Sequence, residues 1–269
     1  MDTARAIDRI RGSFPFEGYI DRESGTYEDT GETARALLPA GGSVLEFGSG
    51  PCDRIAVLSA LDLKCAAFDD LRDPWHREGD NRERIRRFAQ EVGVDLRVGD
   101  DITTERWELE PFDMVMIHDV LEHWHDSPRP LLNELLSRVR DGGYLFVTIP
   151  NAANLRKRLN ILRGHTNYPP YEQYFWSERW RGHIREYVRD DLEQLCRHLG
   201  LNVRRLEGRN HMLRNLPAKM RPLYEQSSRL FPGARDTWLL VAEKPPGWQP
   251  KVLTDAELRS LALIGTPFG

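Results

Sequence analysis

Val44-Leu45-Glu46-Phe47-Gly48-Ser49-Gly50-Pro51-Cys52-Asp53 is the stretch that decides the fold, and Ala66-Ala67-Phe68-Asp69-Asp70-Leu71 follows it about one βα unit later. This order indicates a buried strand, a glycine turn that opens a helix, a second apolar strand and an acid at that strand's carboxyl end. Gly48 and Gly50 carry no Cβ, so the backbone can turn sharply there and approach a ligand. Asp69 can accept from both hydroxyls of a ribose. The pattern predicts a doubly wound α/β sheet that holds an adenosine.

The same loop disfavours a diphosphate ligand. A nicotinamide-binding loop reads G-x-G-x-x-G, and here Asp53 takes the place of the third glycine. That acid stands at the helix entrance, where a pyrophosphate needs the positive potential of free N–H groups. Glu46 lies shortly before the first glycine and would attract a cationic ligand. A positively charged nucleoside without phosphates therefore fits the loop better than a dinucleotide does.

Further motifs follow in order along the chain. The first, Val94–Asp101, is an apolar segment that ends in a pair of acids. The second, Phe112–His123, is an apolar strand followed by a Leu-Glu-His loop. The third, Gly142–Asn151, is a strand that begins with Gly-Gly-x-Leu. A weaker match begins at His183-Ile184-Arg185-Glu186-Tyr187 and includes the helix after it. With the glycine loop, this series resembles the class I S-adenosylmethionine-dependent methyltransferases over residues 44 to about 201.

The resemblance implies a fold and a set of binding residues. The expected fold is α/β, a doubly wound and mostly parallel seven-stranded sheet with an antiparallel last strand, N-terminal helices and a cap insertion after the fifth strand. The expected cofactor is S-adenosylmethionine. The residues expected to contact it are Glu46, Gly48, Ser49, Gly50, Asp69, Asp70, Asp100, Asp101 and His118.

The chain divides into three segments on these patterns. Residues 1–42 are expected to be a helical segment that either folds over the pocket as a lid or covers the sheet, 43–244 the methyltransferase domain, and 245–269 a tail with one short helix. Apolar spacing predicts a helix from Ser127 to about Arg140, which the glycines after it would end. Residues 152–182 carry no clear strand and are rich in aromatic and arginine side chains, which favours an ordered cap at the ligand-binding edge.

Methyl transfer from a sulfonium needs a positioned nucleophile and, for a hydroxyl, a base. His123 is the first candidate, because a neutral imidazole accepts a proton near pH 7, and Glu122 or Asp119 could orient it. His183 is the second candidate. Two alternatives stay open: the Glu-His pair only shapes the loop beneath the cofactor, or proximity alone carries the reaction.

The acids and histidines around residue 122 also raise the question of a metal. Asp, Glu and His can together hold Mg²⁺ or a transition ion, and some sugar O-methyltransferases of the resembled superfamily use a divalent ion. The spacing does not distinguish such a site from a hydrogen-bonded loop. Mg²⁺ is therefore an open cofactor, and no metal ligand is assigned.

Composition restricts the partners. The 269-residue chain has a net charge of −4, which argues against binding nucleic acid mainly through phosphates, and its three cysteines lack metal-ligand spacing. No apolar run is long enough to span a bilayer, and the first dozen residues contain no apolar stretch of the kind found in signal sequences. A cytoplasmic protein is expected, and a homodimer is left open.

The sequence thus favours a methyltransferase acting on a hydroxyl of a sugar, glycan or glycolipid intermediate. Flat aromatic rings in the cap, such as Tyr174 and Trp180, could stack on sugar faces, or could instead form a small core of their own. The main alternative acceptor is a small molecule or secondary metabolite with a phenol, carboxylate or amine. An RNA methyltransferase and a non-catalytic, cofactor-binding partner protein are weaker alternatives.

Overall fold

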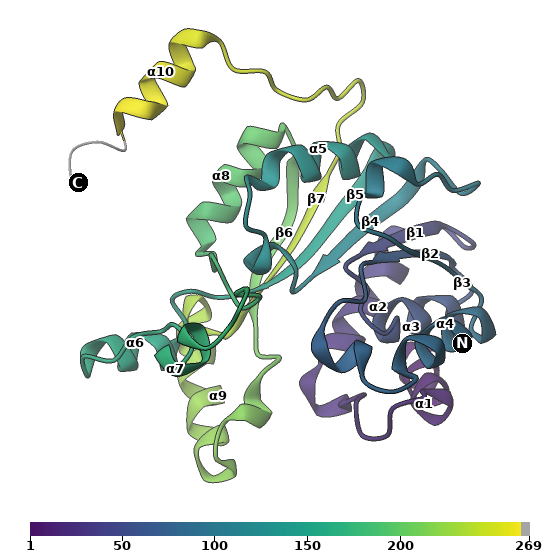
Figure 1. Ribbon diagram of the computed structural model, residues 1–269, viewed down its shortest axis with the longest axis horizontal. Coiled ribbons are helices and arrows are strands. Elements are labelled where there is room, and N and C mark those ends of the chain that lie inside the picture. The colour runs from purple at the N-terminus through teal and green to yellow at the C-terminus, as the bar shows by residue number, and fades with distance from the viewer. Residues whose placement is uncertain (265–269) are drawn as a thin grey trace.

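A seven-stranded sheet forms the centre of the protein in a computed structural model that describes residues 1–264, with strand order β3-β2-β1-β4-β5-β7-β6 (Figure 1). Its strands are β1 (Ser43–Phe47), β2 (Lys64–Asp69), β3 (Val94–Val98), β4 (Phe112–His118), β5 (Val139–Pro150), β6 (Asn202–Arg209) and β7 (Thr237–Glu243). The first five strands pair in parallel, and β7 runs antiparallel to both β5 and β6. The expected fold, with its antiparallel last strand, is confirmed.

Helices cover both faces of this sheet. The helices among the described residues are α1 (Thr3–Ser13), α2 (Thr26–Leu37), α3 (Asp53–Ala60), α4 (Asn81–Glu91), α5 (Pro128–Ser137), α6 (Leu155–Leu162), α7 (Tyr171–Phe175), α8 (Arg189–Leu199), α9 (Arg221–Leu230) and α10 (Asp255–Ile264). One hydrophobic core packs α5 and α8 against the sheet, and a second packs α1 to α4 against the opposite face. Side chains alternate between the two cores along β4, as the two-residue period of a strand requires. Burial of these two cores is the main driving force for the fold.

The predicted helix after Ser127 ends earlier than expected. Ser127 caps it through its hydroxyl, and Pro128 takes the first helical position, as the sequence indicates. The helix ends at Ser137, however, and Val139 already pairs with Phe112 in the sheet. The following glycines lie inside β5. At Gly143 a Cβ would come within 2.8 Å of the Asp113 carbonyl oxygen, so a glycine is needed there for close strand approach and not to end the helix.

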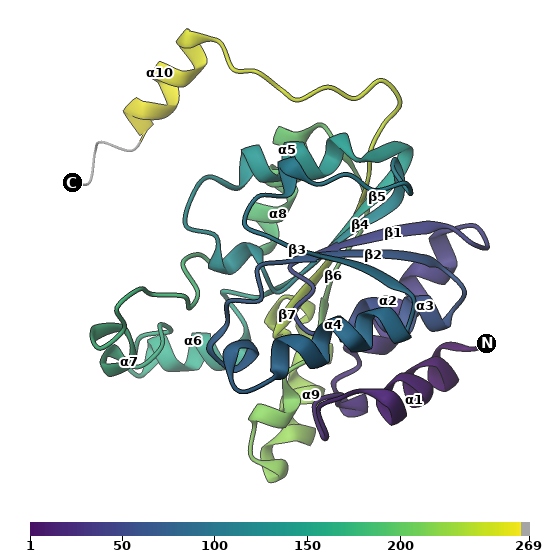
Figure 2. The ribbon, with the colours of Figure 1, turned by 45° about the vertical axis from the view of Figure 1, so that its right-hand side comes forward.

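The amino-terminal and cap segments lie on different sides of the sheet. The helices α1 and α2 pack on α3, and no part of residues 1–42 lines the cavity described below. Residues 152–182, expected without regular structure, contain α6 and α7, which project away from the sheet in both views (Figure 2). No helix among the described residues has both the length and the apolar character needed to span a membrane.

Candidate functional site

A cavity of about 610 Å³ opens at the carboxyl ends of the central strands. The loops after β1 and β4 border it, and these neighbouring strands continue into opposite halves of the sheet. Such a reversal of strand order is where open α/β sheets bind their ligands. The remaining walls come from the loops after β2 and β3 and from Arg179, Trp180 and Arg181 at the end of the cap.

The glycine loop and Asp69 form one hydrogen-bonded unit at this cavity. The Gly50 N–H donates to Asp69 Oδ2 at 2.7 Å, and the Leu71 N–H donates to Oδ1 at 2.6 Å. Gly48 has φ +71°, and a Cβ there would lie 2.4 Å from a methyl group of Val120. Burial raises the pKa of Asp69, while the two backbone N–H groups act in the opposite direction. Asp69 therefore fixes the loop as well as facing the cavity.

Two other predicted acids lie at the cavity, and one does not. Asp70 and Asp100 line its wall, where Arg181 approaches Asp70 to 3.4 Å and Arg72 pairs with Asp100 at 2.5 Å. Asp101 points elsewhere, because its carboxylate caps a short 3₁₀-helix by accepting from the Thr103 N–H. Of the two adjacent acids, Asp100 therefore lines the cavity and Asp101 caps a short helix beside it.

Three more residues expected to bind the cofactor have buried side chains away from the cavity wall. Glu46 is 2% exposed on β1, and burial raises its pKa well above the ordinary value while Arg54 opposes the shift. The Ser49 hydroxyl lies 3.7 Å from Cys52 Sγ. His118 contacts the Thr148 hydroxyl at 2.8 Å and packs on Phe146, and burial lowers its pKa far below the usual range. None of the three lines the cavity.

One partly buried arginine beside the cavity was not predicted from the sequence. Arg54, in the first turn of α3, pairs with Asp119 at 2.7 Å directly behind the cavity wall. Asp119 itself has φ +55°, an unusual backbone conformation for a residue with a side chain. Asp53 lies beside this pair and accepts from the Tyr27 hydroxyl at 2.6 Å, inside the protein and not on the cavity. Arg54 thereby compensates the acids that surround the helix entrance, and no spacing rule in the sequence predicts that partner.

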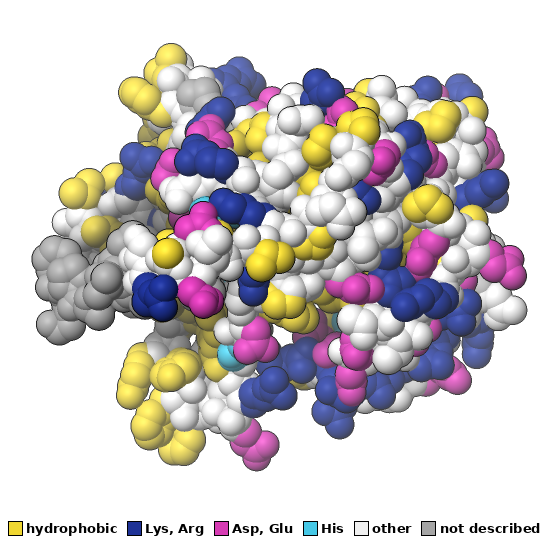
Figure 3. Space-filling model, turned by 90° about the horizontal axis from the view of Figure 1, so that it is seen from above, with side chains coloured by type: hydrophobic (Ala, Val, Ile, Leu, Met, Phe, Trp, Pro, Cys, Tyr) yellow, Lys and Arg dark blue, Asp and Glu magenta, His cyan; other side chains and the backbone are white. Residues whose placement is uncertain are grey.

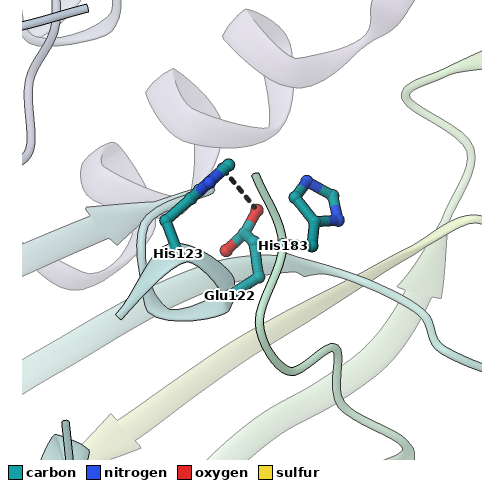
Figure 4. A group of neighbouring side chains, drawn as sticks. All are labelled: Glu122, His123 and His183. Carbon is teal, nitrogen blue, oxygen red and sulfur yellow. Dashed lines mark ion pairs between the residues drawn. The ribbon is translucent and has the colours of Figure 1, made fainter. Parts of the chain in front are cut away.

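The structure brings all three proposed catalytic residues together. Glu122, His123 and His183 offer ligand or proton-accepting atoms that lie within 4.8 Å of one another (Figure 4). Glu122 and His123 belong to the 3₁₀-helix Leu121–His123 after β4, and His183 follows the cap. The Ile184 N–H donates to the Glu122 carbonyl at 2.6 Å and fixes this meeting of distant segments. Of the three, only His123 lines the cavity.

Hydrogen bonds determine which ring nitrogens carry protons. His123 Nδ1 lies 2.8 Å from the Arg181 carbonyl oxygen, which can only accept, so Nδ1 donates and Nε2 keeps its lone pair. His183 Nδ1 lies 2.7 Å from Glu186 Oε1 in a matching arrangement. Burial, reinforced by His123, lowers the pKa of His183 to about 4, so this ring is neutral near pH 7. His183 therefore keeps an unshared pair on Nε2, and the neutral tautomer of His123 does the same.

Glu122 is the buried acid of this cluster. Neither of its side-chain oxygens has a hydrogen-bond partner among the described residues. Burial, and next the charge of Asp119, raise the pKa of Glu122 to about 8, so the group is mostly protonated at neutral pH. An unpaired buried acid costs stability unless a ligand, a proton or an ion satisfies it. The cluster can accordingly handle a proton, or hold an ion through one carboxylate and two imidazoles.

Comparison with known proteins places this site in a family. The family model for a methyltransferase domain matches residues 20–206, which include the glycine loop, Asp69 and the Glu122–His123–His183 cluster. No curated protein matches the chain.

Solved structures share the fold at low sequence identity. A cyclopropane-fatty-acyl-phospholipid synthase-like protein from Lactobacillus casei ATCC 334 is 15% identical with a TM-score of 0.56, covering 89% of this chain and 99% of that one. TehB from Haemophilus influenzae is 12% identical with a TM-score of 0.55, covering 89% and 67%. These similarities support the fold and leave the acceptor to be argued from the site.

Proposed function

This chain belongs to the methyltransferase-domain family, and with it to the class I S-adenosylmethionine-dependent methyltransferases, and from that premise we propose that it methylates a hydroxyl of a sugar, glycan or glycolipid intermediate. The observation that carries the proposal is the position of His123 on the cavity wall, where the Arg181 carbonyl oxygen accepts from Nδ1–H and the neutral tautomer therefore carries its lone pair on Nε2. A hydroxyl needs such a base more than an amine does, because its proton must leave as the new bond forms.

The adenosine half of the cofactor would lie along the loops after β1, β2 and β3. Asp69 would accept from the ribose hydroxyls with the lone pairs that Gly50 and Leu71 leave open. Asp100, at the end of β3, would meet the adenine amino group. The sulfonium group carries a positive charge, and the acids along the cavity favour a cation over a phosphate.

The reaction itself would take place beside the loop after β4. S-adenosylmethionine supplies an electrophilic methyl group, and the acceptor oxygen attacks it in line. His123 would take the hydroxyl proton on Nε2, while the Arg181 carbonyl oxygen stabilises the Nδ1–H of the imidazolium that forms. His183, held by Glu186, is the second candidate for this role. Glu122 Oε1 lies 4.0 Å from His123 Nε2, so the ionised form of Glu122 would stabilise the charged ring.

The walls on this side suit a carbohydrate. Trp124 and Trp180 line the cavity, and their flat faces could stack on the C–H face of a sugar ring. Asp126 lies on the same walls and could bond sugar hydroxyls, whereas the His125 ring is already bonded to the Trp180 carbonyl oxygen at 2.9 Å. A phenol, carboxylate or amine on a small molecule is the alternative acceptor, because an aromatic wall also accommodates a flat ring.

A divalent ion is a second way to activate the hydroxyl at the same place. Glu122, His123 and His183 lie close enough to share one ion. Mg²⁺, the ion considered from the sequence, prefers oxygen ligands, whereas two imidazoles and one carboxylate suit zinc, iron or another transition ion. A bound ion would occupy the His123 lone pair and replace that residue as the activating group. The two mechanisms therefore exclude each other.

Substitution of His123 tests the proposed base. With a sugar or glycolipid acceptor, His123→Ala should lower kcat by about a hundredfold or more and leave the affinity for S-adenosylhomocysteine unchanged. The matched control is His125→Ala, which removes another imidazole from the same wall and should change kcat by only about threefold or less. Near-normal turnover of the His123 variant would reject this residue as the base, and loss of turnover in His183→Ala alone would transfer the role.

A further inference from the structure

The cap exposes an unusual amount of apolar surface. Six large side chains between residues 162 and 176 are each at least 58% exposed, and together we name them the apolar cap surface: Leu162, Tyr168, Tyr171, Tyr174, Phe175 and Trp176. Large apolar side chains gathered in one exposed patch mark an interaction site, whereas single ones do not. Figure 3 shows hydrophobic side chains gathered at one edge of the molecule, while charged side chains of both signs are scattered over the rest of the face in view.

Contacts between the rings make this surface continuous. Tyr171 lies 5.9 Å from Phe175, and Phe175 lies 5.0 Å from Trp176, measured between ring centroids. Tyr174 lies 6.4 Å from Tyr171 and 5.7 Å from Trp180, which belongs to the cavity wall. An unbroken set of aromatic rings therefore connects the exposed surface to the mouth of the cavity.

The cap has a net positive charge, whereas the whole chain has a net negative charge. Residues 152–182 contain six basic and two acidic side chains, whereas the whole chain has a net charge of −4. Several of these arginines, Arg156, Arg163 and Arg179 among them, form no ion pair with the described residues. A basic segment with exposed Trp, Tyr and Leu has the composition of surfaces that insert into the headgroup region of anionic bilayers.

A second copy of the chain is a poorer occupant of the same surface. A symmetric dimer would place the patch against itself, so two basic caps would face each other. An anionic lipid surface has the opposite sign and accepts both the aromatic rings and the arginines. The charge of the cap therefore favours the bilayer over self-association.

We propose that the apolar cap surface docks on an anionic lipid bilayer and turns the cavity mouth toward it. Docking by itself does not depend on the reaction. Its consequence for the acceptor rests on the proposed function, and it selects a glycolipid or another lipid-carried hydroxyl over a freely diffusing sugar.

Vesicle flotation with the full-length protein tests the docking without any methyl donor. The vesicles are phosphatidylcholine alone and an equal mixture with phosphatidylglycerol. The test variant is Tyr171→Ser/Phe175→Ser/Trp176→Ser, whose three sites are exposed and outside the cavity wall. The matched control is Val203→Ser/Val252→Ser, which removes exposed apolar side chains elsewhere. Circular dichroism and S-adenosylhomocysteine binding establish that each variant is folded.

The expected result is binding to the anionic vesicles, weakened by added salt and by about tenfold or more in the triple variant, with no loss in the control. Equal or absent binding to the two kinds of vesicle would overturn the proposal. A dimer in solution that the triple variant dissociates would also overturn it, because the surface would then be a subunit interface. Failure of methyl transfer in a vesicle-binding protein would contradict only the proposed function.

Discussion

Asp69 is the residue whose replacement tests the cofactor pocket most sharply. Its two oxygens accept the Gly50 and Leu71 N–H groups at 2.7 and 2.6 Å and would also accept from the ribose. Hydrogen bonds to a charged group contribute about 1.5 to 3 kcal/mol each. Loss of one such bond to the ligand in Asp69→Asn should therefore weaken S-adenosylhomocysteine binding by about 10- to 140-fold, at about 1.4 kcal/mol per tenfold change.

Isothermal titration of the folded variants provides the measurement. The matched control is Asp101→Asn, because the sequence assigned Asp101 to the same pocket and the structure places it in a 3₁₀-helix cap. The control should bind S-adenosylhomocysteine as the wild type does. Unchanged affinity in Asp69→Asn would remove this residue from the ribose site. An equal loss of affinity in both variants would refute the claim that Asp69 faces the cofactor whereas Asp101 only caps a helix.

Three further predictions concern the loop, the cluster and the sheet. Gly48→Ala should lower thermal stability more than Gly50→Ala, because both positions have positive φ but only the first places a Cβ against Val120; equal losses in calorimetry would refute the steric argument. Overnight dialysis against a chelator should leave turnover unchanged if His123 is the base, whereas loss of turnover restored by zinc, but not by Mg²⁺, would favour the metal mechanism. Asp113→Asn should lower the free energy of unfolding by about 1 to 3 kcal/mol at pH 7, because the carboxylate accepts from the Ser43 N–H and from Arg140. Those hydrogen bonds lower the pKa of Asp113, so its stabilisation is present above about pH 4 and is lost as the pH falls through the folded-state pKa; urea titrations of the variant and wild type should converge in acid.

The glycine loop and its acid were predictable because their requirements are local. A turn after a buried strand needs glycine, and an acid one strand later reaches the same sheet edge, so Gly50 and Asp69 meet as expected. Strand periodicity also accounts for the burial of two residues expected to bind the cofactor. Glu46 shares the face of Val44, and His118 shares the face of Met116, so both side chains lie on a core face of the sheet.

Other features depend on contacts that no local pattern contains. Arg54 lies 65 residues before Asp119, and His183 reaches Glu122 only because the cap returns to the loop after β4. The early end of α5 follows from the pairing of Val139 with Phe112, which outweighs the two glycines that suggested a later stop. Contacts between segments far apart in the sequence determine these ion pairs and this helix end, so they could not be predicted from local sequence patterns.

The location of the transferred methyl group tests the central claim most directly. The protein is incubated with S-adenosylmethionine carrying a deuterated methyl group and with separate lipid and polar extracts of cells, and labelled products are identified by mass spectrometry and nuclear magnetic resonance. The account predicts a methyl ether on a sugar hydroxyl, found in the lipid extract. Label on an amine, a carboxylate or a phenol of a small molecule would contradict it.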